Sequence, residues 1–327
     1  MLAWKVIEYG YYKDVLEQGE MPRTEPGPGQ VEIRVGATAL SFAQMLRIAG
    51  QYQLKDPLPF IPGMDAAGEV VAVGPECPFA VGDRVMGTAA TGACAEYSVL
   101  QGDLSYRVPE AMPDTDAAAF LNAHQTSYVG LVHQGRLKAG EVVLVHGAAG
   151  GVGLAAIQIG RMLGATVIAT ASSPEKLAAC TAQGAHHVID YSKDDFVAAV
   201  QDITAGHGAD VIYDPVGGDV FDRSRRCIAF DGRLVVVGFA SGRIPEIAVN
   251  RMLLRTFSVT GFTLHAYKAH QPQVLEQAQQ TLFDRYLEGH VKPVISHTLP
   301  MTRLVEGLDL LESRQVIGKV VLLPEWE

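Results

Sequence analysis

The stretch Val142-Val143-Leu144-Val145-His146-Gly147-Ala148-Ala149-Gly150-Gly151-Val152-Gly153 decides the fold of this chain. Its first four residues predict a buried strand, its small residues predict a tight turn, and the apolar residues 151–163 predict a helix. A strand, a glycine-rich turn and a helix in this order are typical of a dinucleotide site, because a pyrophosphate contacts backbone N–H groups at a helix N-terminus that a Cβ would obstruct. The alternative is an ordinary structural turn between a strand and a helix.

The spacing of the small residues fits the dinucleotide fingerprint in two of three places. Gly150 and Gly153 stand at its second and third glycine positions, and Ala148 stands at the first. We therefore expect the cofactor phosphates to be held at Ala149, Gly150, Gly151, Val152 and Gly153.

Short apolar stretches alternate with helical ones from this turn onward. The expected strands are 142–145, 166–170, 187–189, 211–213, 234–237 and 257–260. The expected helices are 151–163, 175–183, 195–204, 219–230 and a weaker one near Asn250. Because parallel neighbours need helical crossovers, this order predicts an α/β fold, a Rossmann doubly wound parallel sheet.

The flanking regions predict a second, mainly β domain. Residues 30–39 alternate apolar and polar side chains, and short strand candidates separated by Gly and Pro follow up to residue 100. After Thr263 the pattern is helical, and it ends in a strand-like stretch at 319–323. We expect a β substrate domain at 1–119, a Rossmann NADP-binding domain at 120–262, and a segment at 263–327 that returns to the substrate domain.

The end of the second Rossmann strand decides which nicotinamide cofactor fits. An NAD site carries Asp or Glu there to hold the ribose hydroxyls, whereas this chain has Ser172, Ser173 and, one helical turn later, Lys176. Hydroxyls and a positive charge suit a 2′-phosphate, so we expect NADPH. The alternative is that the serines cap the following helix and Lys176 is solvated. Small residues after the later strands, around Gly217 and around Phe239 and Ser241, would let the nicotinamide ribose approach.

Composition restricts the partners. The formal net charge is −10 and no long run of Lys or Arg occurs, which argues against nucleic acid or an anionic membrane. The four cysteines form no C-x-x-C pair, and the N-terminus has no long apolar stretch behind a basic start. We expect a cytoplasmic protein with reduced thiols and a small-molecule substrate.

The sequence resembles the medium-chain dehydrogenase/reductase superfamily, and within it the zinc-free quinone oxidoreductase (ζ-crystallin-like) branch. The motifs that carry the resemblance are Arg47-x-x-Gly50-x-Tyr52, Leu58-Pro59-Phe60-Ile61-Pro62-Gly63, Ala67-Gly68-x-Val70-x-x-Val73-Gly74, Gly82-Asp83-Arg84-Val85, the glycine-rich turn, Asp214-x-Val216-Gly217-Gly218 and Gly318-Lys319-Val320-Val321-Leu322. The resemblance implies a GroES-like β domain built from both chain ends. It also implies a homodimer through the last Rossmann strand, between Ser258 and Phe262.

The resemblance also implies roles for single residues. Lys176 and Tyr191 match positions that hold the adenosine phosphate, Thr126 matches a residue near the nicotinamide carboxamide, and Lys319 joins the cofactor-binding candidates. The chain departs from the branch at Ser41-Phe42-Ala43-Gln44, where the branch has Asn-Tyr/Phe-x-Asp, and at Asp65, where it has Glu. Ser41 can still donate a hydrogen bond to the substrate or the nicotinamide.

No catalytic zinc is expected, because the ligands are missing. A Cys belongs near residues 41–44 and a His belongs where Met64 stands, while Cys94 is the single thiol in the region of the structural zinc lobe. Without a Lewis acid, hydride transfer favours an acceptor that is already electron-poor. Tyr52 is a candidate proton donor, with solvent or a purely packing role as alternatives, and a lone His such as His146 is more often structural.

These observations favour a zinc-independent, NADPH-dependent quinone reductase that works by one- or two-electron transfer. The first alternative is reduction of the carbon–carbon double bond of an enone or an enoyl thioester. The second is an NADPH-binding protein without catalytic activity.

Overall fold

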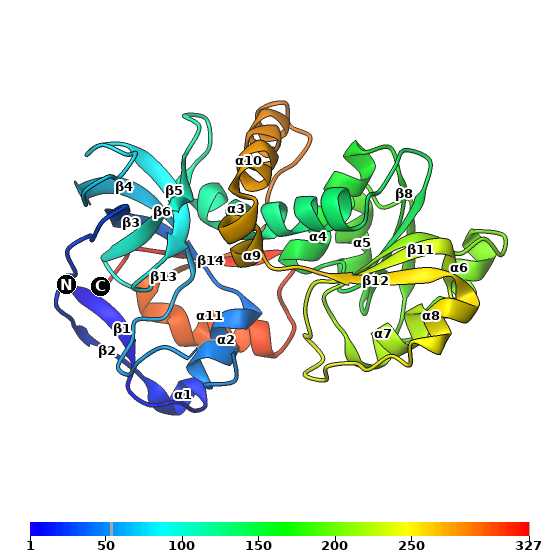
Figure 1. Cartoon of the computed structure of the whole chain (residues 1–327). Coiled ribbons are helices and arrows are strands. Elements are labelled where there is room, and N and C mark those ends of the chain that lie inside the picture. The colour runs from blue at the N-terminus through cyan, green and yellow to red at the C-terminus, as the bar shows by residue number, and fades with distance from the viewer. Residues whose placement is uncertain (53–54, 327) are drawn as a thin grey trace. The chain divides into compact units, whose positions relative to one another are not determined.

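The chain folds into two compact units in a computed structural model that describes residues 1–52 and 55–326 (Figure 1). The first unit is Met1–Asn122 with Val294–Glu327, and the second is Ala123–Pro293. The boundary falls within helix α3 (Asp114–Tyr128). The sequence predicts that residues 263–327 return to the first domain, but residues 263–293 belong to the second unit.

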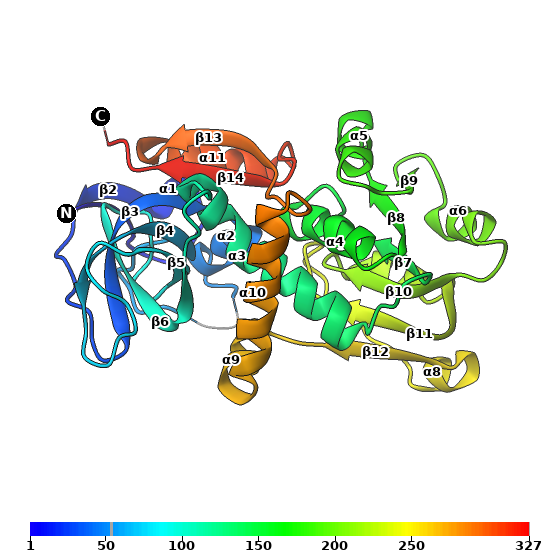
Figure 2. The same ribbon diagram turned by 90° about the horizontal axis from the view of Figure 1, so that it is seen from above.

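The second unit holds a six-stranded sheet in the order β12-β11-β10-β7-β8-β9 (Figure 2). All of its neighbouring strands are parallel, which confirms the predicted doubly wound α/β fold. The strands are β7 (Val142–Val145), β8 (Thr166–Ala171), β9 (His187–Asp190), β10 (Ala209–Asp214), β11 (Ile228–Val236) and β12 (Phe257–Gly261). The strand order reverses between β7 and β10, and ligands of such sheets bind at the carboxyl ends of the strands at this point.

Helices connect these strands. They are α4 (Gly151–Met162), α5 (Pro174–Ala182), α6 (Phe196–Ile203), α7 (Gly218–Ser224) and α8 (Asn250–Arg255). The π-helix η1 (Val129–Gln134) continues α3, and α9 (Leu264–His270) and α10 (Pro272–Leu287) complete the unit. Strands β7, β8 and β10 are almost wholly buried, as expected for strands covered on both faces.

One predicted helix is too long. The prediction extended it over 219–230, but α7 ends at Ser224 and β11 begins at Ile228. The run Ile228-Ala229-Phe230 is apolar and short, so its pattern fits a helix as well as a strand. Pairing of Ala209 on β10 with Ile228 makes it a strand, and the register shifts before the next pair.

The first unit is built on a second six-stranded sheet, in the order β13-β14-β3-β4-β5-β6. An additional pairing between β3 and β6 closes β3, β4, β5 and β6 into a ring. These strands are β3 (Gln30–Ala39), β4 (Asp65–Val73), β5 (Arg84–Ala89), β6 (Tyr97–Arg107), β13 (Ile295–Pro300) and β14 (Lys319–Leu323). The remaining elements are β1 (Leu2–Val6), α1 (Tyr12–Val15), β2 (Leu16–Glu20), α2 (Phe42–Ile48), the 3-10 helix η2 (Met301–Arg303) and α11 (Leu304–Glu312).

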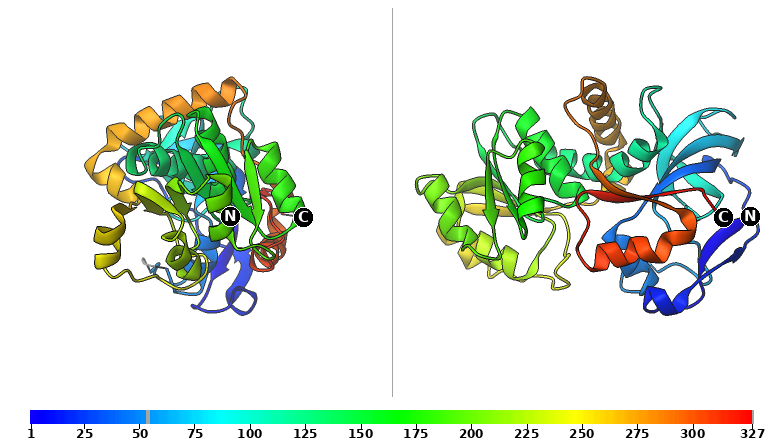
Figure 3. Two further views of the ribbon diagram at one scale, coloured as in Figure 1. Left: turned by 90° about the vertical axis from the view of Figure 1, so that its right-hand side faces the viewer. Right: turned by 180° about the vertical axis from the view of Figure 1, so that it is seen from behind.

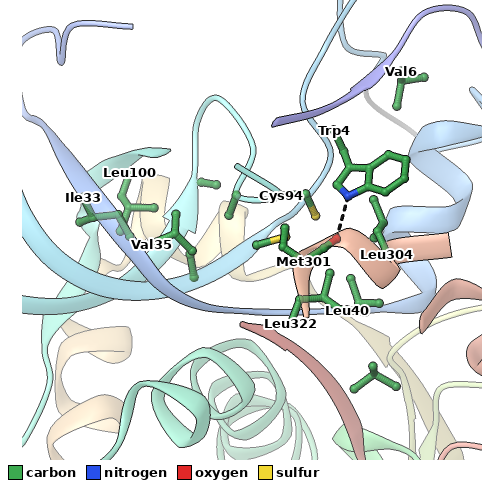
Figure 4. Packing of buried hydrophobic residues seen from close by; sticks show 14 of the residues in the cluster. Trp4, Val6, Ile33, Val35, Leu40, Cys94, Leu100, Met301, Leu304 and Leu322 are labelled. Atoms are coloured by element: carbon green, nitrogen blue, oxygen red, sulfur yellow. Dashed lines mark hydrogen bonds between the residues drawn. The ribbon is translucent and has the colours of Figure 1, made fainter. Parts of the chain in front are cut away.

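Both chain ends contribute to the core of this unit. Strand β14 pairs with β3, so the last part of the chain contributes to the sheet of the first unit (Figure 3). The Trp4 indole N–H donates to the carbonyl of Met301 at 2.7 Å, inside a cluster that includes Ile33, Leu100 and Leu322 (Figure 4). Burial of each such aliphatic side chain stabilises the fold by about 1.5–3 kcal/mol.

Candidate functional site

The glycine-rich turn presents unused backbone donors at the start of α4. Gly150 is the N-cap of this helix and has no side chain to cap it. The Leu154 N–H donates to the Gly150 carbonyl at 2.9 Å, which is the first bond of the helix. The N–H groups of Gly151, Val152 and Gly153 therefore have no carbonyl partner within α4, and together with the positive end of the helix dipole they suit a bound phosphate.

Close approach of backbone explains the glycine at 153. A Cβ on Gly153 would lie 2.4 Å from the Gly147 carbonyl oxygen and 2.6 Å from that of Ala148. A Cβ on Gly150 would meet only the Gly147 oxygen, at 3.3 Å, which leaves its other side open. Ala148 is fully buried, so the departure from the first fingerprint glycine is accommodated in the protein interior rather than on the phosphate side. The turn thus fits a pyrophosphate.

The carboxyl end of β8 gathers the expected 2′-phosphate ligands. Ser172 follows the strand, Lys176 lies in the first turn of α5, and the Tyr191 N–H donates to the Ala171 carbonyl at 3.1 Å. This bond places Tyr191, whose side chain is 47% exposed, beside the end of β8. A hydroxyl, an ammonium and a phenol therefore come from the segments beside one strand end, and residues 171–174, directly at that end, include no Asp or Glu.

Ser173 has a structural duty in the same turn. Its hydroxyl oxygen accepts the Lys176 backbone N–H at 3.4 Å, so Ser173 is the N-cap of α5. The Glu175 carboxylate accepts its own backbone N–H and the Ser173 hydroxyl, and both bonds lower the pKa of Glu175. Ser173 therefore caps α5, as the alternative interpretation of the two serines predicts. Ser172 is not the N-cap of this helix.

The nearest acidic side chain does not provide an NAD-type ribose ligand. Asp190 pairs in register with Ala171, but its carboxylate accepts the Ser192 hydroxyl at 2.5 Å and the Lys193 ammonium at 2.9 Å. These contacts, with the Ser192 hydroxyl contributing most, hold the pKa of Asp190 below its usual range. The carboxylate is thus engaged by Ser192 and Lys193, in the loop that follows β9.

Two further loops at the carboxyl ends of strands lie against each other. The Asp214 carboxylate accepts the N–H groups of Val216 and Gly217 at 2.8 and 3.0 Å. The Ser241 N–H then donates to the Val216 carbonyl at 2.9 Å. A Cβ on Gly217 would lie 3.0 Å from the Phe239 ring, so the structure brings Gly217, Phe239 and Ser241 together.

Two hydroxyls that the sequence analysis missed tie α3 to the turn. Ser127 Oγ lies 2.8 Å from the Val152 carbonyl oxygen and 2.9 Å from Tyr213 Oη. Ser127 is the neighbour of Thr126, the half-buried residue predicted near the nicotinamide. No local pattern marks Ser127 or Tyr213, because their partners are distant in sequence.

His146 is a structural residue beneath the turn. Its two ring nitrogens lie 3.0 Å from Thr170 Oγ1 and 2.9 Å from Ser224 Oγ. The Ser224 hydroxyl donates to the Val220 carbonyl, so Ser224 Oγ accepts from His146 Nε2. Burial, with a smaller contribution from Arg223, lowers the pKa of His146 to about 3. A ring held in this way is a poor proton donor for catalysis.

Polar candidates of the first unit lie around α2 and the start of β4. Ser41 is the N-cap of α2 without a side-chain cap bond, and its hydroxyl lies 4.0 Å from Met64 Sδ. The Gln44 side-chain amide donates to Cys94 Sγ at 3.5 Å, and burial raises the pKa of Cys94 to about 12. Tyr52 is half-buried and its backbone N–H donates to Leu46 at 3.2 Å.

Lys319 lies with a buried acid at the start of β14. Its ammonium nitrogen is 3.9 Å from Asp65 Oδ2, and the Asn122 amide donates to the two Asp65 oxygens at 3.3 and 3.4 Å. Burial raises the pKa of Asp65 and lowers that of Lys319, while each partner opposes the shift of the other. The predicted cofactor ligand Lys319 is therefore held by a carboxylate of its own unit.

The donor set of the first unit does not suit zinc. The positions where zinc-dependent relatives would need a thiolate and an imidazole hold the hydroxyl of Ser41, the amide of Gln44 and the thioether of Met64. Within residues 1–52 and 55–326, no cluster of three or more His, Cys, Asp or Glu side chains could hold a metal ion. In the same residues, no helix has the length and apolar character that a membrane span requires.

Comparison with known proteins gives the family. Residues 27–112 match the alcohol dehydrogenase GroES-like domain, and residues 151–280 match the family described as zinc-binding dehydrogenase. The quinone oxidoreductase of Pseudomonas aeruginosa is 36% identical over 98% of this chain and 99% of its own length. The chain belongs to the quinone oxidoreductase branch of the medium-chain dehydrogenase/reductase superfamily.

Solved structures agree with this assignment. The Escherichia coli quinone oxidoreductase complexed with NADPH has a TM-score of 0.92 at 28% identity and covers 99% of this chain and 100% of its own. A 2-haloacrylate reductase has a TM-score of 0.87 at 31% identity, with both chains fully covered at 100%.

Proposed function

We propose that the chain is an NADPH-dependent quinone reductase that does not use zinc. The observation that carries the proposal is the pairing of two sites in the second unit: three N–H groups at the start of α4 that have no carbonyl partner within the helix, and Ser172, Lys176 and Tyr191 around the end of β8. The first site suits a pyrophosphate and the second suits a 2′-phosphate. NADPH supplies the hydride when it is bound.

The remaining candidates would orient the nicotinamide and the acceptor. Gly217, Phe239, Ser241 and Thr126 would surround the nicotinamide end, and Lys319 would contribute positive charge. Ser41 would donate a hydrogen bond to the acceptor or the nicotinamide. Tyr52 would deliver a proton to the reduced oxygen, in competition with solvent.

An electron-poor acceptor follows from the ligands of the first unit. The side chains of Ser41, Gln44 and Met64 do not suit a zinc ion, which is the Lewis acid that would stabilise an alkoxide. Oxidation of simple alcohols is therefore disfavoured. A quinone accepts hydride without this help, and the protein contributes proximity and orientation.

Reduction of an activated carbon–carbon double bond is the second candidate. It is favoured by the likeness to a 2-haloacrylate reductase, whose named substrate carries a double bond conjugated to a carboxylate. Hydride addition to an enone and to a quinone both use an acceptor in which a double bond is conjugated with a carbonyl group.

A panel of acceptors tests both candidates. Purified protein, with and without a chelator, is mixed with NADPH or NADH, and cofactor oxidation is followed with 1,2-quinones, 1,4-quinones, enones and 2-haloacrylate. We expect quinone-dependent oxidation that prefers NADPH and survives the chelator. Turnover with enones or 2-haloacrylate alone would replace the first candidate by the second. Tight NADPH binding without any turnover would leave a non-catalytic binding protein.

We also propose a homodimer that pairs strand β12 of two copies. This strand is at the edge of the second unit's sheet, so its outer backbone groups face no neighbouring strand of the same sheet. Phe230, Val249, Leu253 and Leu254 are each 72–78% exposed around it. The Asp231 N–H donates to the Thr256 carbonyl, which brings Phe230 close to the end of α8.

A further inference from the structure

Ser127 stands at the meeting point of three elements of the second unit. Its hydroxyl oxygen lies 2.9 Å from the Ala123 carbonyl of its own helix α3 and 2.8 Å from the Val152 carbonyl in the first turn of α4. It also lies 2.9 Å from the phenol oxygen of Tyr213 on β10. Ser127 and Tyr213 are both fully buried, so water does not compete for these bonds.

The hydrogens can be assigned from the partners. Each hydroxyl has one hydrogen, and Ser127 Oγ is the acceptor that the described residues provide for Tyr213. A buried phenol that does not donate leaves a polar hydrogen unsatisfied, so Tyr213 donates to Ser127. Ser127 then donates to the Val152 carbonyl and shares this hydrogen with Ala123. Burial accordingly raises the pKa of Tyr213, which keeps the phenol protonated.

We infer that Ser127 is a positioning residue for cofactor binding: its hydroxyl fixes the first turn of α4 against α3. This turn contains the N–H groups of Gly151, Val152 and Gly153, which have no carbonyl partner within α4. Thr126 directly precedes Ser127 on α3. The bond therefore sets the spacing between the pyrophosphate donors and the residue proposed for the nicotinamide. This inference rests on the NADPH-binding part of the proposed function and not on the identity of the acceptor.

The Ser127 bond adds a tie from α3 to the backbone bonds that hold this turn, namely Ala148 N–H to the Thr170 carbonyl at 3.2 Å and Gly150 N–H to the Gly147 carbonyl at 3.0 Å. Gly147 has a φ of +55° and Gly150 has no side chain, so this backbone has more freedom than an ordinary turn. Without the Ser127 bond, part of the binding free energy would be used to order the turn.

Three variants separate positioning from stability. Ser127→Ala removes both the tie to Val152 and the acceptor for Tyr213. Tyr213→Phe leaves the Ser127 hydroxyl free to donate to Val152. The double variant removes the unsatisfied phenol but does not restore the tie. Ser105→Ala is the matched control, because Ser105 is also buried and donates to a backbone carbonyl, that of Gln101 at 2.7 Å, in the first unit.

The expected pattern is a loss of affinity that does not follow stability. NADPH binding, measured by titration calorimetry, should weaken about fivefold in Ser127→Ala and in the double variant, the size of one net hydrogen bond. It should stay within about twofold of the unaltered protein in Tyr213→Phe and Ser105→Ala. The Tm should be lowest in Ser127→Ala and should partly recover in the double variant, because the unsatisfied phenol is gone.

Two further readouts complete the test. Adenosine 2′-monophosphate does not reach the turn, so its affinity should be unchanged in all variants. Hydrogen exchange of the amides at 150–153 in the ligand-free protein should be faster in both variants that lack Ser127. NADPH affinity that stays normal in Ser127→Ala, or that recovers together with Tm in the double variant, would overturn the inference. Failure of the unaltered protein to bind NADPH would overturn the proposed function and this role with it.

Discussion

Lys176 is the residue on which the preference for NADPH over NADH should depend. Its ammonium group would pair with the 2′-phosphate, and charge-assisted hydrogen bonds of this kind contribute about 1.5–3 kcal/mol. Lys176→Ala should therefore weaken NADPH binding by roughly 10- to 100-fold and leave NADH binding within about twofold. Fluorescence titration with both cofactors measures this directly.

A nearby lysine provides the control for Lys176. Lys193→Ala removes a positive charge from the same end of the sheet, but this ammonium is paired with Asp190 at 2.9 Å. NADPH affinity should be almost unchanged in that variant. An equal loss of NADPH and NADH affinity in Lys176→Ala would show that the lysine acts on the fold of α5 and not on the phosphate.

His146 should make the fold sensitive to mild acid. The pKa of His146 is about 3 in the folded protein and about 6.5 when unfolded, so the unfolded state binds the extra proton first. The stabilising neutral state is fully present above about pH 6.5 and is lost as the pH falls towards 3. At pH 5 the loss is about 2 kcal/mol of the free energy of unfolding.

Urea unfolding at several pH values tests the histidine. The free energy of unfolding should decline between pH 6.5 and 4, and the decline should be shallower in His146→Asn, which keeps a polar side chain but does not titrate. His290→Asn is the control, because the side chain of this histidine is 61% exposed and lies outside the buried network of His146. An equal slope in His146→Asn and the unaltered protein would contradict the buried neutral ring.

The sequence predicts residues whose role is marked locally and misses those defined by distant partners. Gly150 and Lys176 can be proposed from the sequence because each stands at a fixed offset from the end of a strand. Ser127 and Tyr213 are 86 residues apart, and nothing near either residue indicates the bond between them. The shared duty of Ser173 was predictable only as an alternative, since a serine before a helix suits a cap and a phosphate equally well.

At the scale of elements, the close approach of α4 to the turn is the most restrictive feature. Gly153→Ala places a Cβ 2.4 Å from the Gly147 oxygen, and both nearest atoms belong to backbone that cannot rotate away. Overpacking of this kind costs about 1–3 kcal/mol of stability. It would also move α4 away from the bound phosphates, so NADPH affinity should fall by at least tenfold, as measured by calorimetry.

Gly19→Ala is the matched control for this element. Gly19 lies in β2, and a Cβ there would meet no atom within 4 Å. Its stability and NADPH affinity should both equal those of the unaltered protein. Full NADPH affinity in a folded Gly153→Ala variant would contradict the assignment of the α4 N-terminus as the phosphate site.

The parallel strands were the elements most open to prediction, because each is a short apolar run between helical stretches. The extended strand pairing in the first unit was harder to predict. Strand β6 runs from Tyr97 to Arg107 and pairs with both β5 and β3, whereas the sequence pattern suggested a strand that ends near Leu100. Gly102 interrupts the apolar pattern, and pairing with a second strand is a property of the closed sheet that local residues do not reveal.

At the scale of the whole molecule, the exposed apolar side chains beside β12 predict the oligomeric state. Leu253 and Leu254 are 78% and 72% exposed on α8, a helix in which no residue is buried. Such side chains beside an unpaired strand edge favour association of two copies. The unaltered chain of 35.0 kDa should therefore have the mass of a dimer in light scattering. Leu253→Asp with Leu254→Asp should shift it to the monomer at micromolar concentration, because association would bury both carboxylates.

The control for the dimer uses an exposed apolar residue elsewhere. Val81 is 66% exposed in the first unit, so Val81→Asp adds a charge without touching the β12 edge and should remain dimeric. The double aspartate variant should still bind NADPH, since Lys176 and the α4 turn belong to one chain. A monomeric unaltered protein would contradict the proposed dimer. A dimer that persists in the double variant would show that the interface lies elsewhere. Loss of NADPH binding together with the dimer would instead indicate that the second copy supports the cofactor site.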